Sequence, residues 1–368
     1  MKLQLDTSKT YAIALEGGGA KGGYEIGVWK ALEEMGIRYN AVSGTSVGAL
    51  NGAMMAMRDL PRAIECWEDI RLDKVIDFDA DQEENLSKVV SGDVELSDIH
   101  QLIPQAFDVI RRRGLDVAPL RAWVREVVDA EKIRRSDVKL YIATVSLTDR
   151  KGLELCVNDL EGDEICDMLL ASAYHPTFRL EKLGGKLYAD GGFIDSLPLH
   201  VLVENGYKDI IAVRIPSRFS RQRRFKIPDD VTVTYVDTDA DLGGVLNFSA
   251  EQARRDMAIG YFDAYHDLCG LYGRKYYVDR LMTEREAFDL LIESYLRKNP
   301  EMPLRELCEK ELPQAAKTLN VTGGYYELFI AVLELAAEEK GLEKLRFYTD
   351  RELLSAVSES REAQTAAV

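Results

Sequence analysis

Two short apolar runs, each followed at once by a glycine-rich turn and then by a helical pattern, constrain the fold of this chain more than any other feature. The first such unit spans residues 11–35 and turns at residues 17–22, and the second spans residues 39–57 and turns at residues 44–48. The apolar spacing changes from that of a strand to that of a helix across each turn. Two strand–turn–helix units in series predict an α/β fold with a largely parallel sheet, whose ligands bind at the carboxyl ends of the strands.

The remaining residues first extend this pattern and then depart from it. Apolar runs predict four further strands at residues 138–145, 153–157, 210–215 and 231–236, and helices at residues 164–173 and 250–271. Beyond residue 272 the chain is helical in pattern, most clearly at residues 287–296 and 325–340. We therefore expect an α/β domain over residues 1–272 and a helical region over residues 273–368. The charged, weakly patterned residues 75–114 are expected to form a helical insertion or lid within the α/β domain.

The composition excludes several classes of protein. Lysine and arginine total 47 against 63 for aspartate and glutamate, giving a net charge of −16. This disfavours nucleic-acid binding and gives no general attraction to anionic membranes, so any peripheral membrane contact must be local. No apolar stretch suits a transmembrane span or the core of a signal peptide. Five cysteines, an odd number without C-x-x-C spacing, predict free thiols in a reducing compartment, and we expect a cytoplasmic location.

The first turn has the spacing of a nucleotide-binding loop but not its surroundings. Gly17, Gly19 and Gly22 satisfy G-x-G-x-x-G. A dinucleotide site also needs a carboxylate at the end of the second strand, and residues 39–42 contain none. A P-loop needs serine or threonine after its lysine, whereas Lys21 is followed by glycine. The sequence therefore predicts neither a nucleotide nor any other cofactor, and no metal ion.

The second turn matches the G-x-S-x-G nucleophile elbow, with Gly44 and Gly48 on either side of Ser46. Glycines at these two positions let a strand turn sharply into a helix and expose the serine hydroxyl. The pattern therefore predicts that Ser46 is a nucleophile.

The same arrangement predicts an oxyanion hole. A helix that begins at the serine directs free backbone N–H groups at a developing oxyanion, and Val47 provides the nearest one. Gly18 and Gly19 of the first turn lack side chains, so their N–H groups can approach the same oxygen. We expect Gly18, Gly19 and Val47 to form the oxyanion hole.

A serine of this type needs a base, and histidine is the usual one. The sequence has four histidines, at His100, His175, His200 and His266. The last three follow the elbow, as an α/β-hydrolase requires, but none has a supporting motif. We interpret all four as structural or surface residues, with His175 the strongest alternative because it follows a helix that could end near the site.

Asp190 is the better candidate for the base. It ends a short strand pattern and is followed by Gly191 and Gly192, which permit a tight turn and a close approach of the backbone. An Asp-Gly pair alone would indicate an ordinary turn.

The three motifs, in this order, resemble those of the patatin-like phospholipase family. In that family a glycine-rich oxyanion loop, here with Gly17, Lys21 and Gly22, precedes a G-x-S-x-G elbow and a D-G-G base motif. The resemblance covers residues 11–215 and implies a three-layer α/β core with a largely parallel sheet, a Ser-Asp dyad without histidine, and hydrolysis of fatty acyl esters. The helical C-terminal region is not explained by it.

The chain departs from the family pattern in two places. The basic residue of the glycine loop is often arginine and here is Lys21, which keeps the charge but loses the planar fork. Where an asparagine often precedes the proline after the D-G-G motif, this chain has Asp195 and Ser196. The second departure affects the expected local support of Asp190.

Substrate binding is less constrained by the sequence. The basic, aromatic-containing residues 214–226 are a candidate phosphate-headgroup site at a membrane surface, or alternatively a solvated charged loop. The favoured function is a lipid acyl hydrolase acting through an acyl-enzyme intermediate. A soluble carboxylesterase or acyl thioesterase on small or CoA-linked substrates is the second alternative. A non-catalytic interaction protein is the third.

Overall fold

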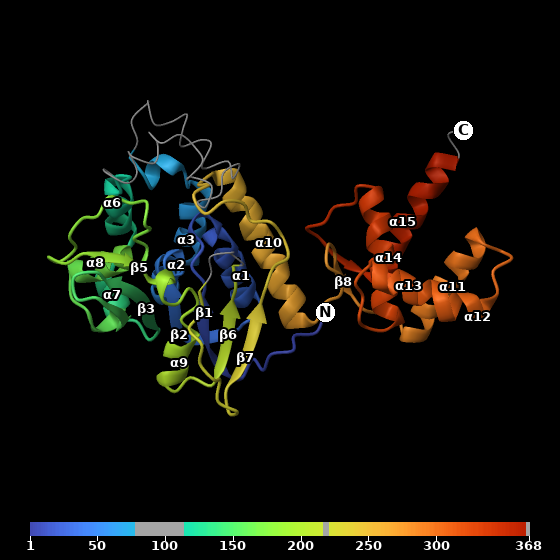
Figure 1. Ribbon diagram of the computed structural model, residues 1–368, viewed down its shortest axis with the longest axis horizontal. Helices are drawn as coiled ribbons and strands as arrows, with labels where there is room; N and C mark the ends of the chain where they lie inside the picture. The colour runs from blue at the N-terminus through green and yellow to red at the C-terminus, as the bar shows by residue number, and fades with distance from the viewer. Residues whose placement is uncertain (78–113, 216–220, 366–368) are drawn as a thin grey trace. The chain divides into compact units, whose positions relative to one another are not determined.

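The computed structural model describes residues 1–77, 114–215 and 221–365 (Figure 1). Its contacts divide the chain into two compact units, a larger one of Asp6–Ala264 and a smaller one of Met1–Leu5 with Tyr265–Val368. We propose that these units correspond to the α/β domain and the helical region expected from the sequence. The expected insertion or lid lies, apart from its ends, outside the described residues.

The larger unit is built on a seven-stranded, mostly parallel sheet, which confirms the predicted α/β fold. The strand order is β4-β3-β2-β1-β6-β7, and β5 also pairs with β3. Strands β4 and β5 are antiparallel to β3, and every other pairing is parallel. The strands are β1 (Thr10–Leu15), β2 (Arg38–Thr45), β3 (Lys139–Ser146), β4 (Lys151–Cys156), β5 (Tyr188–Asp190), β6 (Asp209–Val213) and β7 (Thr232–Val236).

Helices pack on both faces of this sheet, because alternate residues of a buried strand point to opposite sides. On one face Ala12 and Ala14 of β1 cluster with Leu199 and Leu202 of α9. On the other face α2 contacts β2 and β3, and the lack of a side chain at Gly52 lets α2 approach the sheet closely. The helices are α1 (Gly23–Glu34), α2 (Val47–Ala56), α3 (Leu60–Glu68), α6 (Ala118–Val127), α7 (Ala130–Arg134), α8 (Asp163–Ser172), α9 (Leu199–Glu204) and α10 (Ala250–Cys269).

Helices α1 and α10 cross at a contact that only glycine permits. A Cβ at Gly27 would lie 1.9 Å from the carbonyl oxygen of Met257, and one at Gly260 would lie 2.0 Å from that of Tyr24. Both distances are far below van der Waals contact, so the two backbones touch directly.

Two details differ from the sequence expectation. The strand predicted to reach residue 215 ends at Val213, because the Ile215 N–H donates instead to the Glu16 carboxylate at 2.9 Å. Helices α3, α6 and α7 were not predicted. Helices α6 and α7 follow the residues assigned to the insertion.

The smaller unit has its own hydrophobic core, formed mainly by helices. Two buried carboxylates organise its loops. Asp350 accepts hydrogen bonds from the backbone of Leu281 and Met282, and Glu334 accepts from three successive backbone N–H groups beginning at Arg274. A short parallel strand pair was not expected in this region. The elements are β8 (Tyr277–Asp279), α11 (Glu284–Lys298), α12 (Leu304–Glu306), a π turn (Leu307–Glu311), α13 (Leu312–Thr318), α14 (Tyr325–Glu339), β9 (Phe347–Thr349) and α15 (Asp350–Thr365).

None of the helices in the described part of the chain combines the length and the apolarity that a membrane crossing needs.

Candidate active site

Ser46 lies at a sharp turn between β2 and α2, in a backbone conformation that residues other than glycine rarely adopt. Its φ is 57° and its ψ is −125°, and α2 begins at the next residue. A Cβ at Gly44 would lie 2.2 Å from the Gly48 carbonyl oxygen, and one at Gly48 would lie 2.8 Å from that of Leu15. Both flanking glycines are therefore required by space. Strain of this kind persists only where the surrounding structure holds it in place.

Three hydrogen bonds provide that support. The Ser46 N–H donates to Ser172 Oγ at 3.0 Å, and that hydroxyl donates in turn to the Ala143 carbonyl at 2.7 Å. The neighbouring Thr45 hydroxyl donates to the carbonyl of Asp195 at 2.9 Å. The elbow is therefore tied to β3, to α8 and to the loop that follows β5.

The glycine loop lies beside this turn. Gly17, Gly18 and Gly19 line the same cavity as Ser46 and Val47. Gly19 has a φ of 58°, and a Cβ there would lie 2.2 Å from the carbonyl oxygen of Val245. A 3₁₀ turn over Gly19–Gly22 then leads into α1. The structure thus brings the candidate oxyanion donors to one wall of one cavity.

Gly22 and Lys21 lie behind this wall. A Cβ at Gly22 would lie 2.6 Å from the Val47 side chain, so Gly22 lets the loop pack against the start of α2. Burial lowers the pKa of the Lys21 ammonium, and the carboxylates of Asp241, Asp256 and Glu16 partly oppose this. Neither Lys21 nor Gly22 is among the residues that line the cavity.

Asp190 ends β5 and is buried in the cavity wall, with 8% of its surface exposed. Burial raises the pKa of its carboxyl to about 6, while hydrogen bonds from the Ser46 hydroxyl and the Gly192 N–H lower it. The Gly192 N–H donates to Oδ1 at 2.8 Å. A Cβ at Gly191 would lie 2.2 Å from the Ala143 carbonyl oxygen, so this glycine allows the loop to lie against β3. The arrangement joins a partly buried serine hydroxyl to a carboxyl of raised basicity.

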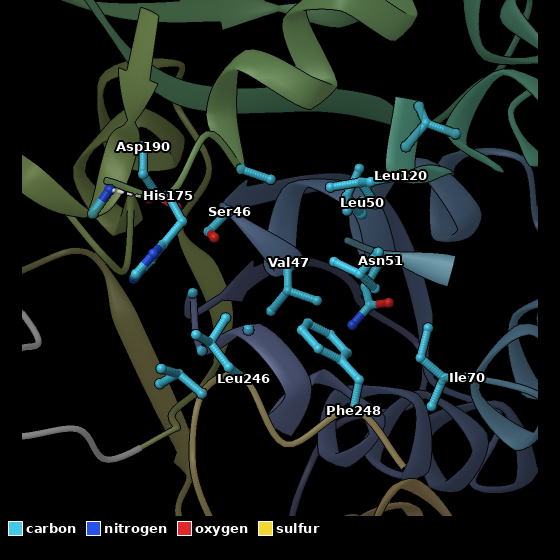
Figure 2. A pocket seen from close by; sticks show the side chains of 18 of the residues that line it. Ser46, Val47, Leu50, Asn51, Ile70, Leu120, His175, Asp190, Leu246 and Phe248 are labelled. Carbon is cyan, nitrogen blue, oxygen red and sulfur yellow. Dashed lines mark hydrogen bonds between the residues drawn. The ribbon is translucent and has the colours of Figure 1, made fainter. Parts of the chain in front are cut away.

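The cavity has a volume of about 580 Å³, and beyond Ser46 its wall is largely apolar. Figure 2 shows Leu50, Leu120 and Ile70 on the opposite side of Ser46 from Asp190 and His175. Helices α2, α3 and α6 supply most of this wall. The sequence analysis did not identify it, although the apolar spacing within α3 and α6 was the available signal. Its members include Leu50, Met54, Trp67, Ile70, Leu120, Trp123, Val124 and Val127.

Of the three histidines in the described part of the chain, His175 alone lines the cavity, on the Asp190 side of Ser46. His100 is outside the described residues. His266 belongs to the smaller unit, where it contacts Asp267 and the Gly273 carbonyl. His200 is buried on α9 and does not line the cavity.

His200 is held between two carboxylates. Its Nδ1 lies 2.8 Å from Asp195 Oδ2 and its Nε2 lies 2.7 Å from Glu154 Oε1, which Arg223 also contacts at 3.0 Å. Burial would lower the pKa of His200, but these contacts outweigh burial and raise it. Asp195, noted above as a departure from the family pattern, is thus paired with a histidine.

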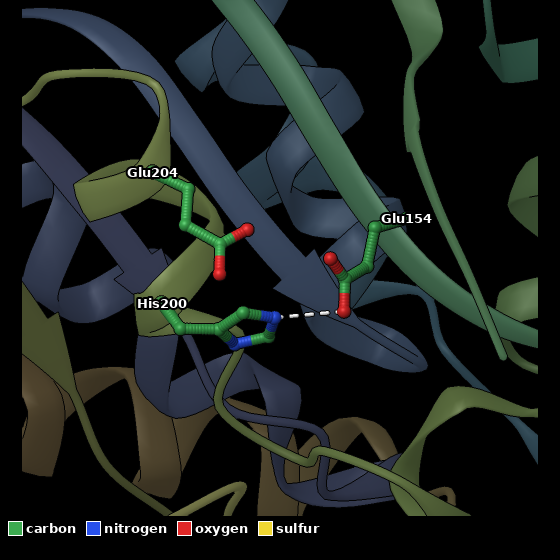
Figure 3. Close-up of side chains that lie close together, drawn as sticks. All are labelled: Glu154, His200 and Glu204. Atoms are coloured by element: carbon green, nitrogen blue, oxygen red, sulfur yellow. Dashed lines mark hydrogen bonds and ion pairs between the residues drawn. The ribbon is translucent and has the colours of Figure 1, made fainter. Parts of the chain in front are cut away.

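Among the described residues, Glu154, His200 and Glu204 place one ligand atom each within 4.8 Å of one another (Figure 3). Arg223 Nη1 lies 2.8 Å from His200 Nε2 at the same point. Because Arg223 Nη1 contacts both His200 Nε2 and Glu154 Oε1, the group is better described as an ion-pair network.

Some of the described basic residues in the range 214–226 form ion pairs with carboxylates, and others do not. Arg214 pairs with Asp237 at 3.3 Å and Arg223 pairs with Glu154. Arg221 lines the cavity, and its carbonyl accepts hydrogen bonds from the N–H and hydroxyl of Ser196. Within the described chain no carboxylate lies within ion-pair distance of Arg221. Residues 216–220 lie outside the described residues.

A protein-family sequence model described as "Patatin-like phospholipase" matches residues 13–203, which include the glycine loop, the elbow and the Asp190 motif. The chain belongs to this family. The sequence resemblance is therefore confirmed, and the family region ends within α9, before β6, β7 and α10.

The relatives described below share either a low sequence identity with this chain over a long region or a higher identity over a short one. Patatin-like phospholipase domain-containing protein 6 of Mus musculus is 24% identical over 332 residues, covering 77% of this chain and 22% of the relative. Lysophospholipase nte1 of Aspergillus terreus is 50% identical over 48 residues, 13% of this chain and 3% of the relative. The chain thus spans only a minor part of these relatives. Among solved structures, VipD from Legionella pneumophila aligns with a TM-score of 0.36 and 14% identity over 97% of this chain and 88% of that one.

Proposed function

We propose that this chain is a serine acyl hydrolase that cleaves fatty acyl esters of lipids, with Ser46 as nucleophile and Asp190 as base. One observation carries the proposal. The hydroxyl of a strained Ser46, the buried Asp190 carboxyl and the glycine loop meet in the wall of one cavity whose opposite wall is apolar. Family membership and the names of the relatives support the same class of reaction.

In the proposed mechanism Asp190 takes the proton of Ser46 as Oγ attacks the ester carbonyl carbon. The bond from that carbon to the alcohol oxygen then breaks, and the alcohol leaves with the proton that Asp190 returns. A water molecule, deprotonated by the same carboxylate, hydrolyses the acyl-enzyme. A carboxyl with a pKa of about 6 is a stronger base than an ordinary aspartate and is still largely ionised at neutral pH.

Oxyanion stabilisation supplies the rest of the proposed catalysis. Val47 begins α2, so its N–H has no intrahelical acceptor and lies at the positive end of the helix dipole. Gly18 and Gly19 present their backbones from the facing loop. Loss of one such donor typically costs about 10²–10³ in rate.

The apolar wall supports an acyl chain as the group bound on one side of Ser46. A volume of about 580 Å³ falls within the range of small-molecule sites. The Trp67 indole N–H donates to Asn51 at 2.9 Å, so its ring is fixed in the wall. This wall distinguishes a long acyl chain from a short one.

Peripheral contact with an anionic lipid surface is part of the proposal, and Arg221 is its main support. The variant Arg221→Gln should weaken binding to vesicles containing anionic phospholipid at low salt, because an exposed local cation is lost. Arg223→Gln is the matched control, because Arg223 is already paired with Glu154. Equal binding by wild type and Arg221→Gln would remove this part of the proposal. A cytoplasmic location, supported by five unpaired cysteines, remains part of the proposal as well.

Reaction with a fluorophosphonate probe tests the central claim. Wild type should be labelled, Ser46→Ala should not, and Asp190→Asn should be labelled more slowly. Ser358→Ala, an exposed serine of α15, is the control. Labelling that persists in Ser46→Ala contradicts the assignment of the nucleophile, and folded wild type that is never labelled favours the interaction-protein alternative. Equal turnover of dispersed and vesicle-bound esters would favour the soluble esterase alternative.

A further inference from the structure

The cavity wall beside Asp190 contains a histidine that the proposed dyad does not use. The Asp190 N–H donates to the carbonyl of Tyr174 at 3.0 Å, and His175 is the next residue in the chain. The His175 side chain lines the cavity on the same side of Ser46 as Asp190 (Figure 2). The turn after α8 therefore holds this ring next to the candidate base.

The contacts of His175 fix which ring nitrogen carries the proton. The backbone N–H of Thr177 donates to Nδ1 at 3.4 Å, and the Thr177 hydroxyl lies 2.9 Å from the same atom. A backbone N–H can only donate, so Nδ1 is an acceptor. Burial lowers the pKa of His175 to about 4, so the ring is neutral near pH 7 and its one proton is on Nε2.

The Nε2–H is available to a ligand. No described residue forms a hydrogen bond with it, and the ring is held by an edge contact with Phe178 at a centroid distance of 5.8 Å. The cavity wall thus contains a neutral, oriented donor.

The reaction geometry indicates which substrate atom this donor meets. In the proposed mechanism the glycine loop binds the carbonyl oxygen, and the apolar wall on the far side of Ser46 from His175 binds the acyl chain. Asp190 must return its proton to the alcohol oxygen, so that oxygen leaves on the Asp190 side. His175 lies on that side.

We propose that His175 is a specificity-determining residue whose Nε2–H donates a hydrogen bond to the alcohol oxygen of the scissile ester. This inference rests on the proposed hydrolase function and deepens it. His175 transfers no proton: Asp190 takes the proton from Ser46 and returns it to the alcohol oxygen as the carbon–oxygen bond breaks. The His175 hydrogen bond stabilises the negative charge that develops on this oxygen.

The proposal makes the chain selective for oxygen esters over thioesters. Sulfur is a weak hydrogen-bond acceptor, so a leaving thiolate gains little from the His175 donor. A hydrogen bond to a developing charge corresponds to a rate factor of about 10 to 100.

The test compares a glycerol monoester with the matching thioglycerol S-ester of the same fatty acid. In His175→Leu the ratio of kcat/KM for the oxygen ester to that for the thioester should fall about 10-fold to 100-fold. His175→Gln, whose amide nitrogen can occupy the position of Nε2, should restore much of the ratio, and His175→Asn, whose amide nitrogen corresponds to Nδ1, should not. Fluorophosphonate labelling of Ser46 in each variant shows that the fold and the nucleophile are retained.

The outcomes separate this inference from the proposed function. A wild type that hydrolyses neither substrate and is not labelled overturns both. If wild type hydrolyses both substrates and His175→Leu leaves the ratio unchanged, the role of His175 is overturned and the dyad stands. Loss of labelling together with equal loss on both substrates in all three folded variants would assign His175 to the base itself, and would also overturn the inference.

Discussion

Replacing Asp190 with asparagine should stabilise the larger unit while it removes the proposed base. Burial holds the carboxyl at a pKa of about 6 in place of 3.8, a difference of about two units. Each unit corresponds to about 1.4 kcal/mol, so the folded state carries about 3 kcal/mol of unfavourable free energy above pH 6. Asparagine resembles the protonated carboxyl, and it keeps an acceptor for the Gly192 N–H.

The stabilisation should depend on pH in one direction. Below pH 3.8 the carboxyl is protonated in both the folded and the unfolded chain, and wild type and variant should be equally stable. As the pH rises to about 6 the unfolded chain releases the proton while the folded chain retains it, so the wild type loses stability. The difference should be about 3 kcal/mol at pH 7.5 and roughly half of that at pH 5.

Urea denaturation followed by tryptophan fluorescence measures this difference in one unit of the chain. The three tryptophans, Trp29, Trp67 and Trp123, all belong to Asp6–Ala264, so the signal does not report on the smaller unit. Asp195→Asn is a matched control that should lower the free energy of unfolding, because this variant breaks a buried ion pair with His200. An Asp190→Asn variant that is less stable than wild type would refute the reasoning. So would a free energy of unfolding that differs from that of wild type by the same amount at pH 5 and at pH 7.5.

Three further results are expected. The kcat/KM for ester hydrolysis should rise with pH to a plateau with a midpoint near pH 6, since Asp190 must be ionised, and a flat profile from pH 5 to 8 would contradict this. Gly27→Ala should lower the free energy of unfolding in urea by about 3 kcal/mol, and Lys30→Ala on the same helix by less than about 1 kcal/mol. Met54→Trp, which fills the apolar wall, should reduce turnover of long-chain relative to butyryl esters by about tenfold, and an unchanged chain-length profile would show that the acyl chain binds elsewhere.

The strand–turn–helix order and the sheet could be predicted because local pattern decides them. Both glycine turns mark positions where only a residue without a side chain fits, as the 2.2 Å distance at Gly44 shows. The order of the strands in the sheet could not be predicted in this way, because it depends on contacts between residues that are far apart in the sequence. The pairing of β5 with β3 places Asp190 at the site, but the three residues of β5 contain no sequence signal for this pairing.

The position of Asp190 could be anticipated, but its support could not. Asp195 alone suggests a weaker loop, and the sequence does not reveal that its partner is His200, five residues later on α9. The role proposed for His175 depends on which nitrogen Thr177 contacts, and no spacing rule contains that information. The apolar wall was missed because two of its helices, α3 and α6, were not predicted, although their apolar spacing was present in the sequence.

The part of the chain that matches the family is smaller than the part that builds the site. The match ends at residue 203, yet β1 still needs β6 beside it and Gly19 packs on Val245. The backbone contact of Gly27 with Met257 places α10 directly against the helix that continues from the glycine loop. A recombinant fragment cut to the family boundary would therefore lack the residues that support the glycine loop, the proposed oxyanion loop. The shortest fragment that keeps these contacts runs to about the end of the larger unit at Ala264.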